Sequence, residues 1–177
     1  MYRQVYGQVA ARFHQLFPVT CYLCLEAGQK PALDLCPGCE ADLPGNEPAC
    51  PGCAATVPVA GESCRRCLRR RRAFDAAFVP YRYEFPLPEL IRRIKFRGAL
   101  PLTRILGCVL GRRLAERGDP RVDAIVPVPL SMRREHRRGY NQALEIACFA
   151  ARELGLPVED RLARRVRETA EQTGLSA

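Results

Sequence analysis

The sequence has no long uncharged apolar run, which is the feature that a membrane-spanning helix requires. Its charge-free stretch at Cys50–Gly61 holds prolines, glycines and cysteines, a composition typical of turns. Residues 1–18 carry Arg3, Arg12 and His14 among aromatic residues, and they lack the apolar segment and the small-residue cleavage site of a signal peptide. We therefore expect no membrane span, no secretion and a cytoplasmic location.

Lysine is nearly absent as well, although the chain is basic. The formal net charge is +9, from 28 Lys+Arg against 19 Asp+Glu, and almost all the cations are arginine. A guanidinium group binds phosphate through two parallel hydrogen bonds, so this composition favours phosphate-bearing partners. A general use of arginine for exposed positive charge explains the composition equally well, and charge alone does not decide between the two.

Cysteine, in contrast, is abundant and regularly spaced. Eight cysteines form four C-x-x-C pairs: Cys21/Cys24, Cys36/Cys39, Cys50/Cys53 and Cys64/Cys67. In a reducing compartment this spacing indicates metal binding rather than disulfides. Two pairs complete the tetrahedral four-sulfur shell that zinc prefers, so the eight thiolates predict two zinc ions. We expect these ions to be structural, because too few apolar residues precede Arg70 to form a core unaided.

The spacing leaves the pairing of the four motifs open. In the sequential arrangement, which is the simplest, the first two pairs share one ion and the last two share the other; a cross-braced arrangement of alternate pairs also fits. Pro37-Gly38 and Pro51-Gly52 fill the centres of two pairs, where a tight turn needs a fixed or positive φ. A redox role is the weaker interpretation, because a thioredoxin-like pair is normally single and follows a strand.

After the cysteines, the sequence predicts a linker, a strand and two helices. The run Arg69–Arg72 is typical of a solvated linker. Phe74–Phe85 is rich in aromatic and β-favouring residues and predicts one interrupted strand, with an edge position at Pro80. Apolar residues recur at helical spacing in Leu87–Gly98 and Pro101–Gly118, and both amphipathic helices need a partner for their apolar faces. We expect that partner to be a sheet.

A candidate anion-binding segment follows. Val122–Leu130 is short, apolar and β-branched and ends in two prolines, which predicts a buried parallel strand. Ligands of open α/β sheets bind beyond the carboxyl ends of such strands. Ser131–Gln142 carries four arginines and His136 ahead of a helix predicted to end at Gly155, and arginines at a strand tip can hold an anion. A loop of solvated arginines is the alternative interpretation.

Taken in order, these motifs resemble ComF-family proteins. The resemblance is carried by the four cysteine pairs and by the segments Leu90–Gly98, Ile125–Leu130, Arg137–Ala143 and Arg165–Gln172. It implies an α/β chain in which a small N-terminal double zinc ribbon is followed by a type I phosphoribosyltransferase-like (Rossmann-like) domain. It also implies a link to DNA uptake during natural competence or to nucleotide metabolism.

The resemblance further assigns residues to substrate binding on the pyrophosphate side. The loop that meets pyrophosphate is resembled by Pro127, Val128 and Pro129. The residues expected to flank it are Arg137, Arg138, Tyr140, Asn141 and Gln142. The mobile loop that closes over the substrate is resembled by Arg165, Arg167, Thr169 and Gln172.

One part of the family pattern is missing. Family members carry a D-D-x-x-T-T-G segment whose amides hold the 5-phosphate and whose carboxylates bind the ribose hydroxyls, and this sequence has none. We therefore expect an incomplete C-terminal domain that binds phosphoribosyl diphosphate and its Mg²⁺ weakly, with catalytic residues left unassigned. The expected domains are an N-terminal helical segment (1–18), the double zinc ribbon (19–72) and a partial phosphoribosyltransferase-like domain (73–177).

Two other functions fit the same residues. The chain could be a zinc-ribbon accessory protein that binds single-stranded DNA through its phosphates without catalysis, or a bare zinc-ribbon interaction module. The expected partners are therefore a phosphoribosyl diphosphate-like anion, single-stranded DNA and the competence machinery. An affinity for oligonucleotides that falls steeply with salt would indicate the DNA-binding function.

Overall fold

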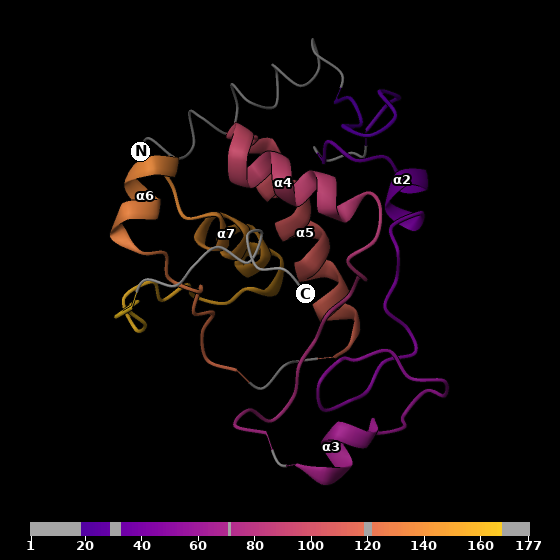
Figure 1. The fold of residues 1–177 in the computed structure, drawn as a ribbon. Helices are drawn as coiled ribbons and strands as arrows, with labels where there is room; N and C mark the ends of the chain where they lie inside the picture. The colour runs from indigo at the N-terminus through magenta and orange to yellow at the C-terminus, as the bar shows by residue number, and fades with distance from the viewer. Residues whose placement is uncertain (1–18, 29–32, 71, 119–121, 168–177) are drawn as a thin grey trace. The chain divides into compact units, whose positions relative to one another are not determined.

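A computed structural model describes residues 19–28, 33–70, 72–118 and 122–167, and their regular secondary structure is helical (Figure 1). The helices are α2 Pro37–Ala41, α3 Arg65–Arg69, α4 Leu87–Arg97, α5 Pro101–Glu116, α6 Met132–Arg138 and α7 Gln142–Leu154. Strand pairing in these ranges is limited to isolated bridges. None of the described helices has both the length and the apolar composition needed to cross a bilayer. The helical segment expected over 1–18 lies outside the described residues.

The chain divides into two compact units between Glu89 and Leu90. The first unit contains two short hairpins, closed by the bridges Thr20–Ala27 and Ala49–Thr56. Each hairpin is followed by a one-turn helix, α2 or α3. Among the described residues its buried apolar side chains are few: Cys21, Leu33, Leu35, Leu43, Cys50, Ala54 and Val57, together with Leu87 from the start of α4. A core of this size needs additional cross-links to be stable.

The segment Phe74–Phe85 does not form the predicted strand. It makes one antiparallel bridge, Tyr81–Gly45, beside which the Asn46 N–H donates to the Pro80 carbonyl at 3.0 Å. The Arg82 N–H donates to the Pro44 carbonyl at 2.8 Å. Because Pro44 and Pro80 have no N–H, the ladder cannot extend as a regular strand would. The segment instead lies against the zinc-ribbon residues that precede the second hairpin.

The two predicted amphipathic helices are confirmed. The buried residues of α4 include Leu90 and Ile94, and the helix is followed by Gly98 at φ +64°. Helix α5 starts at Pro101, where the missing N–H is no loss, and the chain reaches a left-handed Gly118 at φ +96° just after its end.

Helix α5 packs against α7, and glycines set the spacing. A Cβ on Gly107 would lie 2.6 Å from both the Ile146 carbonyl oxygen and the Phe149 Cβ, and one on Gly111 would lie 2.7 Å from the Glu153 Cβ. The facing residues Ala147, Ala150 and Ala151 are small and buried. The Gly107 and Gly111 face of α5 is therefore covered by a helix. The buried apolar residues Leu102, Ile105 and Val109 lie on the opposite face of α5, so a sheet as the partner of that face stays a prediction.

The predicted buried strand Val122–Leu130 is present only as a single parallel bridge, Ile125–Val158. The Ile125 N–H donates to the Pro157 carbonyl and the Glu159 N–H donates to the Ile125 carbonyl, both at 2.9 Å. The parallel direction is thus as predicted. The predicted burial is wrong at Val128, which is 69% exposed. The pairing does not extend into a regular strand, because Pro127 and Pro129 offer no N–H to a neighbouring strand. The described residues form no multi-stranded sheet, so the Rossmann-like domain stays a prediction.

Candidate metal centres and a candidate anion-binding turn

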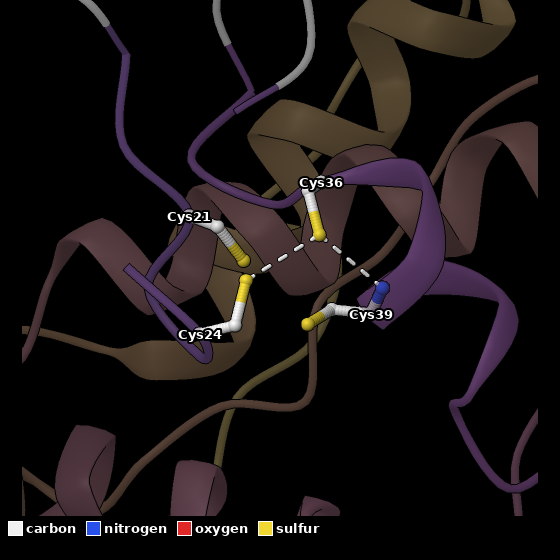
Figure 2. A group of neighbouring side chains, drawn as sticks. All are labelled: Cys21, Cys24, Cys36 and Cys39. Atoms are coloured by element: carbon white, nitrogen blue, oxygen red, sulfur yellow. Dashed lines mark hydrogen bonds between the residues drawn. The ribbon is translucent and has the colours of Figure 1, made fainter. Parts of the chain in front are cut away.

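The first cysteine cluster joins the first hairpin to α2 (Figure 2). The Sγ atoms of Cys21, Cys24, Cys36 and Cys39 all lie within 4.8 Å of one another. The sulfurs of Cys24 and Cys36 are 3.6 Å apart. Cys36 is the N-cap of α2, and its sulfur accepts the Cys39 N–H at 3.4 Å. The helix start therefore fixes one half of the cluster, and the hairpin turn fixes the other.

The second cluster repeats this arrangement with the second hairpin and α3. Its four sulfurs, from Cys50, Cys53, Cys64 and Cys67, meet the same 4.8 Å limit. The Cys53 and Cys64 sulfurs are 3.5 Å apart, and the Cys64 N–H donates to the Cys50 sulfur at 3.3 Å. The structure thus selects the sequential pairing of the C-x-x-C motifs and rules out the cross-braced one.

The left-handed residues of the two cysteine turns are not the glycines of Pro37-Gly38 and Pro51-Gly52. Neither Gly38 nor Gly52 has a positive φ. The positive values fall on the residue directly after the second cysteine of each hairpin, Leu25 at 66° and Ala54 at 56°. Such a conformation is unusual for residues with a Cβ, so both turns depend on the surrounding bonds to hold them. The matching positions show that the two halves of the ribbon share one local design.

Backbone N–H groups converge on one sulfur of each cluster. Burial acts to raise the pKa of the Cys21 thiol, but the N–H groups of Cys24 and Cys36 lower it to about 6. The N–H groups of Cys64 and Cys53 lower the pKa of Cys50 to about 6 as well.

Other thiols in the same clusters shift the opposite way. The neighbouring Cys36 side chain raises the pKa of Cys39, and burial followed by Cys53 raises the pKa of Cys67 to about 11. Four sulfurs this close cannot all be ionised without a cation among them.

A zinc ion fits both clusters. Tetrahedral coordination with Zn–S bonds of about 2.3 Å places the sulfurs roughly 3.8 Å apart. The Cys24–Cys36 sulfurs are 3.6 Å apart and the Cys53–Cys64 sulfurs are 3.5 Å apart, which is similar to that expected spacing. Four thiolates close the coordination shell and leave no position for a substrate, so both centres are structural. Zinc would supply the cross-links that the small apolar core of this unit lacks.

The second cluster has a basic neighbour that the sequence did not predict. Arg72, the end of the supposed solvated linker, hydrogen-bonds the Cys67 side chain, which raises the pKa of the guanidinium group. Its guanidinium also lies 5.9 Å from the centre of the Phe74 ring. Arg72 is half-buried, unlike the exposed Arg69 and Arg70 before it. The sequence did contain a signal for this contact, namely an arginine a few residues after a C-x-x-C pair. Four thiolates around one zinc ion leave a net negative charge, which a nearby cation offsets.

In the second unit, several predicted ligand-binding residues contact the candidate anion-binding turn, which is the backbone of Pro127, Val128 and Pro129. The Asn141 Nδ2 donates to the Val128 carbonyl at 3.2 Å, and its Oδ1 accepts the Ala143 N–H at 3.0 Å, capping α7. Arg165 donates from one terminal nitrogen to the Pro129 carbonyl at 3.4 Å and from Nε to the Arg167 carbonyl at 3.2 Å. Three separate stretches of sequence therefore meet at Val128 and Pro129.

Tyr140 and Arg138, which the resemblance places beside that turn, contact residues of α4. The Tyr140 hydroxyl donates to the Ile94 carbonyl. Arg138 lies over the Phe96 ring at 5.7 Å and donates to the Gln142 Oε1 at 3.1 Å. These side chains therefore have partners within the chain, which gives them a supporting role that the sequence did not indicate. Their contact with a ligand stays a prediction.

The remaining assignments have mixed outcomes. Ser131–Gln142 is not a loop throughout, because Met132–Arg138 forms α6 between Ser131 and a left-handed Gly139 at φ 78°. Arg137, in α6, and Arg167, two residues after Arg165, are both exposed. Thr169 and Gln172 lie outside the described residues.

Comparisons with known proteins agree with this geometry. The family model of the double zinc ribbon domain matches residues 13–68, so this part of the chain is a double zinc ribbon. Competence protein F of Haemophilus influenzae is 34% identical over 149 residues, which cover 81% of this chain and 64% of the relative. The DNA utilization protein YhgH of Salmonella typhi is 32% identical over 163 residues, covering 89% and 64%. The same protein of Salmonella typhimurium gives the same figures.

On these matches the chain belongs to the ComF family. It spans just under two thirds of the length of these curated relatives. No solved structure matches it.

Proposed function

We propose that this chain takes part in the uptake or use of DNA, as a ComF-family protein whose C-terminal unit binds a phosphoribosyl diphosphate-like anion. The names of its relatives support the first part of the proposal. The observation that carries the second part is the meeting of Asn141 and Arg165 at the Val128–Pro129 backbone. This contact holds the Val128–Pro129 backbone, and Arg137 of α6 and Arg167, two residues after Arg165, are exposed. Exposed guanidinium groups at a fixed turn are suited to binding phosphate oxygens.

We propose weak anion binding, rather than turnover, as the activity of these 177 residues, because the D-D-x-x-T-T-G segment is not among them. Isothermal titration of the zinc-loaded protein with phosphoribosyl diphosphate and Mg²⁺ tests this. We expect a dissociation constant in the millimolar range that Arg137→Ala and Arg167→Ala each weaken severalfold. The matched control is Arg161→Ala, an exposed arginine outside the turn, which should change nothing. Micromolar binding, or equal effects of all three variants, would contradict the proposal.

A second function is favoured by one feature of the zinc-ribbon unit. Residues 65–85 carry exposed arginines, mostly in their first part, and exposed aromatic side chains in their last part: Tyr83 is 70% exposed and Phe85 is 85% exposed. The exposed arginines of the same stretch are Arg65, Arg66, Arg69, Arg70 and Arg82. Single-stranded nucleic acids bind such surfaces, because bases stack on aromatic rings while cations hold the phosphates. We propose the two exposed segments, residues 65–70 and 82–85, as the site for single-stranded DNA.

Fluorescence titration with a labelled oligothymidylate tests the DNA site. Stacking contributes about 1–3 kcal/mol per base, so Tyr83→Ala and Phe85→Ala should each weaken binding by roughly tenfold. Leu68→Ala removes an equally exposed side chain that cannot stack, and it should leave the affinity unchanged. The affinity of the unmodified protein should fall steeply with salt, because arginine–phosphate contacts release counterions. Binding that is absent or independent of salt would rule the site out.

A further inference from the structure

Asn46 is the best-connected buried polar side chain of the zinc-ribbon unit. It is 5% exposed, and its Nδ2 donates to two carbonyls, that of Ala54 at 2.8 Å and that of Val79 at 3.0 Å. Its Oδ1 accepts the Thr56 hydroxyl at 3.1 Å. Both amide protons and the amide oxygen are therefore used. A buried side-chain amide with every group bonded fixes the segments it joins, because losing any one bond leaves a buried group unpaired.

One end of this network is the turn that presents two metal ligands. Ala54 directly follows Cys53, and its N–H donates to the Cys50 carbonyl at 2.8 Å. The Cys50 N–H in turn donates to the Ala55 carbonyl at 2.8 Å. The direction of the Ala54 carbonyl, which accepts from Asn46, is therefore set by the same left-handed turn that holds the two sulfurs.

The other end is a segment that supplies no metal ligand. Asn46 reaches residues 79–82 through its side chain, at the Val79 carbonyl, and through its backbone N–H, at the Pro80 carbonyl. The neighbouring Tyr81–Gly45 bridge and the bond from Arg82 to Pro44 continue this contact. Arg82, Tyr83 and Phe85 follow immediately, and they form one end of the proposed DNA site.

We infer that Asn46 is a positioning residue through which metal binding at the second cysteine cluster orders residues 79–82. When the metal is lost, the bonds that tie the four sulfurs together are gone, the Cys50–Cys53 turn can open and the Ala54 carbonyl moves away from Asn46. The segment then loses the side-chain bond that holds it to the ribbon. The first cluster has no such connection among the described residues, since Leu25, which matches Ala54, is 77% exposed. Control of DNA binding by this route rests on the DNA site proposed above, whereas the ordering itself does not.

Hydrogen exchange of the full-length, zinc-loaded protein tests the inference, with the Arg82 amide as reporter because it donates to Pro44 across the contact. In Asn46→Ala we expect Arg82 to exchange at least tenfold faster while the protein still holds two zinc ions. Thr56→Val removes only the bond to Oδ1, and we expect a smaller change in the same direction. Unchanged exchange at Arg82 in Asn46→Ala, or the loss of zinc from that variant, would overturn the inference.

The two clusters provide the matched control. Cys67→Ser disrupts the second cluster and should speed exchange at Arg82 as much as Asn46→Ala does. Cys39→Ser disrupts the first cluster and should leave Arg82 protected while one zinc ion is lost. Equal exchange at Arg82 in the two cysteine variants would overturn the inference.

Oligothymidylate titration of Asn46→Ala separates this inference from the DNA proposal. Faster exchange with several-fold weaker DNA binding supports both. Faster exchange in a protein that never bound DNA supports the ordering and refutes the site. Normal exchange together with normal DNA binding refutes the ordering and keeps the site.

Discussion

Gly107 of α5 lies directly against Phe149 of α7, so closely that a Cβ added to the glycine would stand 2.6 Å from the Cβ of the phenylalanine. The Ile146 carbonyl oxygen is equally near. With Gly111 one turn later, this contact lets the two helix backbones approach more closely than side chains of ordinary size would permit. It makes small residues, rather than large apolar ones, the determinant of packing between α5 and α7.

Gly107→Ala should destabilise the protein in spite of the higher helix propensity of alanine. Overpacking of this kind costs about 1–3 kcal/mol, which exceeds the gain of about 1 kcal/mol from replacing a helical glycine. Urea unfolding followed by circular dichroism measures the difference. Ala115→Leu adds bulk at an exposed position of the same helix and should change the free energy of unfolding by less than about 0.5 kcal/mol. A stabilised Gly107→Ala variant would show that the helices can separate at no cost.

Cys24→Ser should halve the bound zinc, from two ions per chain to one. Cys24 is the most exposed ligand of its cluster, but a hydroxyl group replaces a thiolate poorly at a four-sulfur site. Zinc is measured by a colorimetric chelator after denaturation. Cys108→Ser, which changes a cysteine of α5 outside both clusters, should retain both ions. Two ions in Cys24→Ser would mean that the Cys24 sulfur is not a ligand.

Chelation of zinc should unfold the first unit selectively. The few buried apolar residues of that unit do not hold it together without metal, whereas α5 and α7 pack on each other without any ligand. We expect chelation to abolish amide protection over residues 33–57 and to leave α5 and α7 protected, with recovery when zinc is restored. Simultaneous loss of protection in both units would indicate that they fold as one.

Stability should decline at alkaline pH in a manner that depends on Tyr140. Burial raises the pKa of this hydroxyl above its ordinary value of 10, and the Glu145 charge acts in the same direction. The hydroxyl can donate to the Ile94 carbonyl only in its protonated form. The folded state therefore keeps a proton that the unfolded state releases, so stability is lost as the pH rises above about 10. The difference in unfolding free energy between the natural protein and Tyr140→Phe, measured from pH 8 to pH 11, should shrink with pH. A constant difference would contradict the hydrogen bond.

The sequence predicted the features that depend on local chemistry. Cysteine spacing indicated two four-sulfur centres, and helix-breaking Pro101, Gly98 and Gly155 marked helix boundaries to within a residue or two. These signals are local because a zinc knuckle and a helix cap are each made by residues a few positions apart.

What could not be predicted depends on contacts between distant residues. The sequential pairing of the cysteine motifs follows from the proximity of each hairpin to the helix after it, and spacing alone allowed both arrangements. The bonds from Asn46 to Val79 and Pro80 overrode the β-propensity of Phe74–Phe85, because a buried amide and two prolines, Pro44 and Pro80, decided its pairing. The supporting roles of Tyr140 and Arg138 were likewise hidden, since their partners on α4 lie more than forty positions earlier in the chain.

The shared design of the two cysteine clusters has an evolutionary consequence. Since each four-sulfur shell closes on its own hairpin and helix, one half can change without disturbing the metal held by the other. The residue after the second hairpin cysteine illustrates this freedom: the earlier copy presents a leucine to solvent, and the later copy turns a small, buried alanine towards the interior. A duplicated scaffold of this kind can retain one copy as a plain cross-link while the other acquires a new attachment.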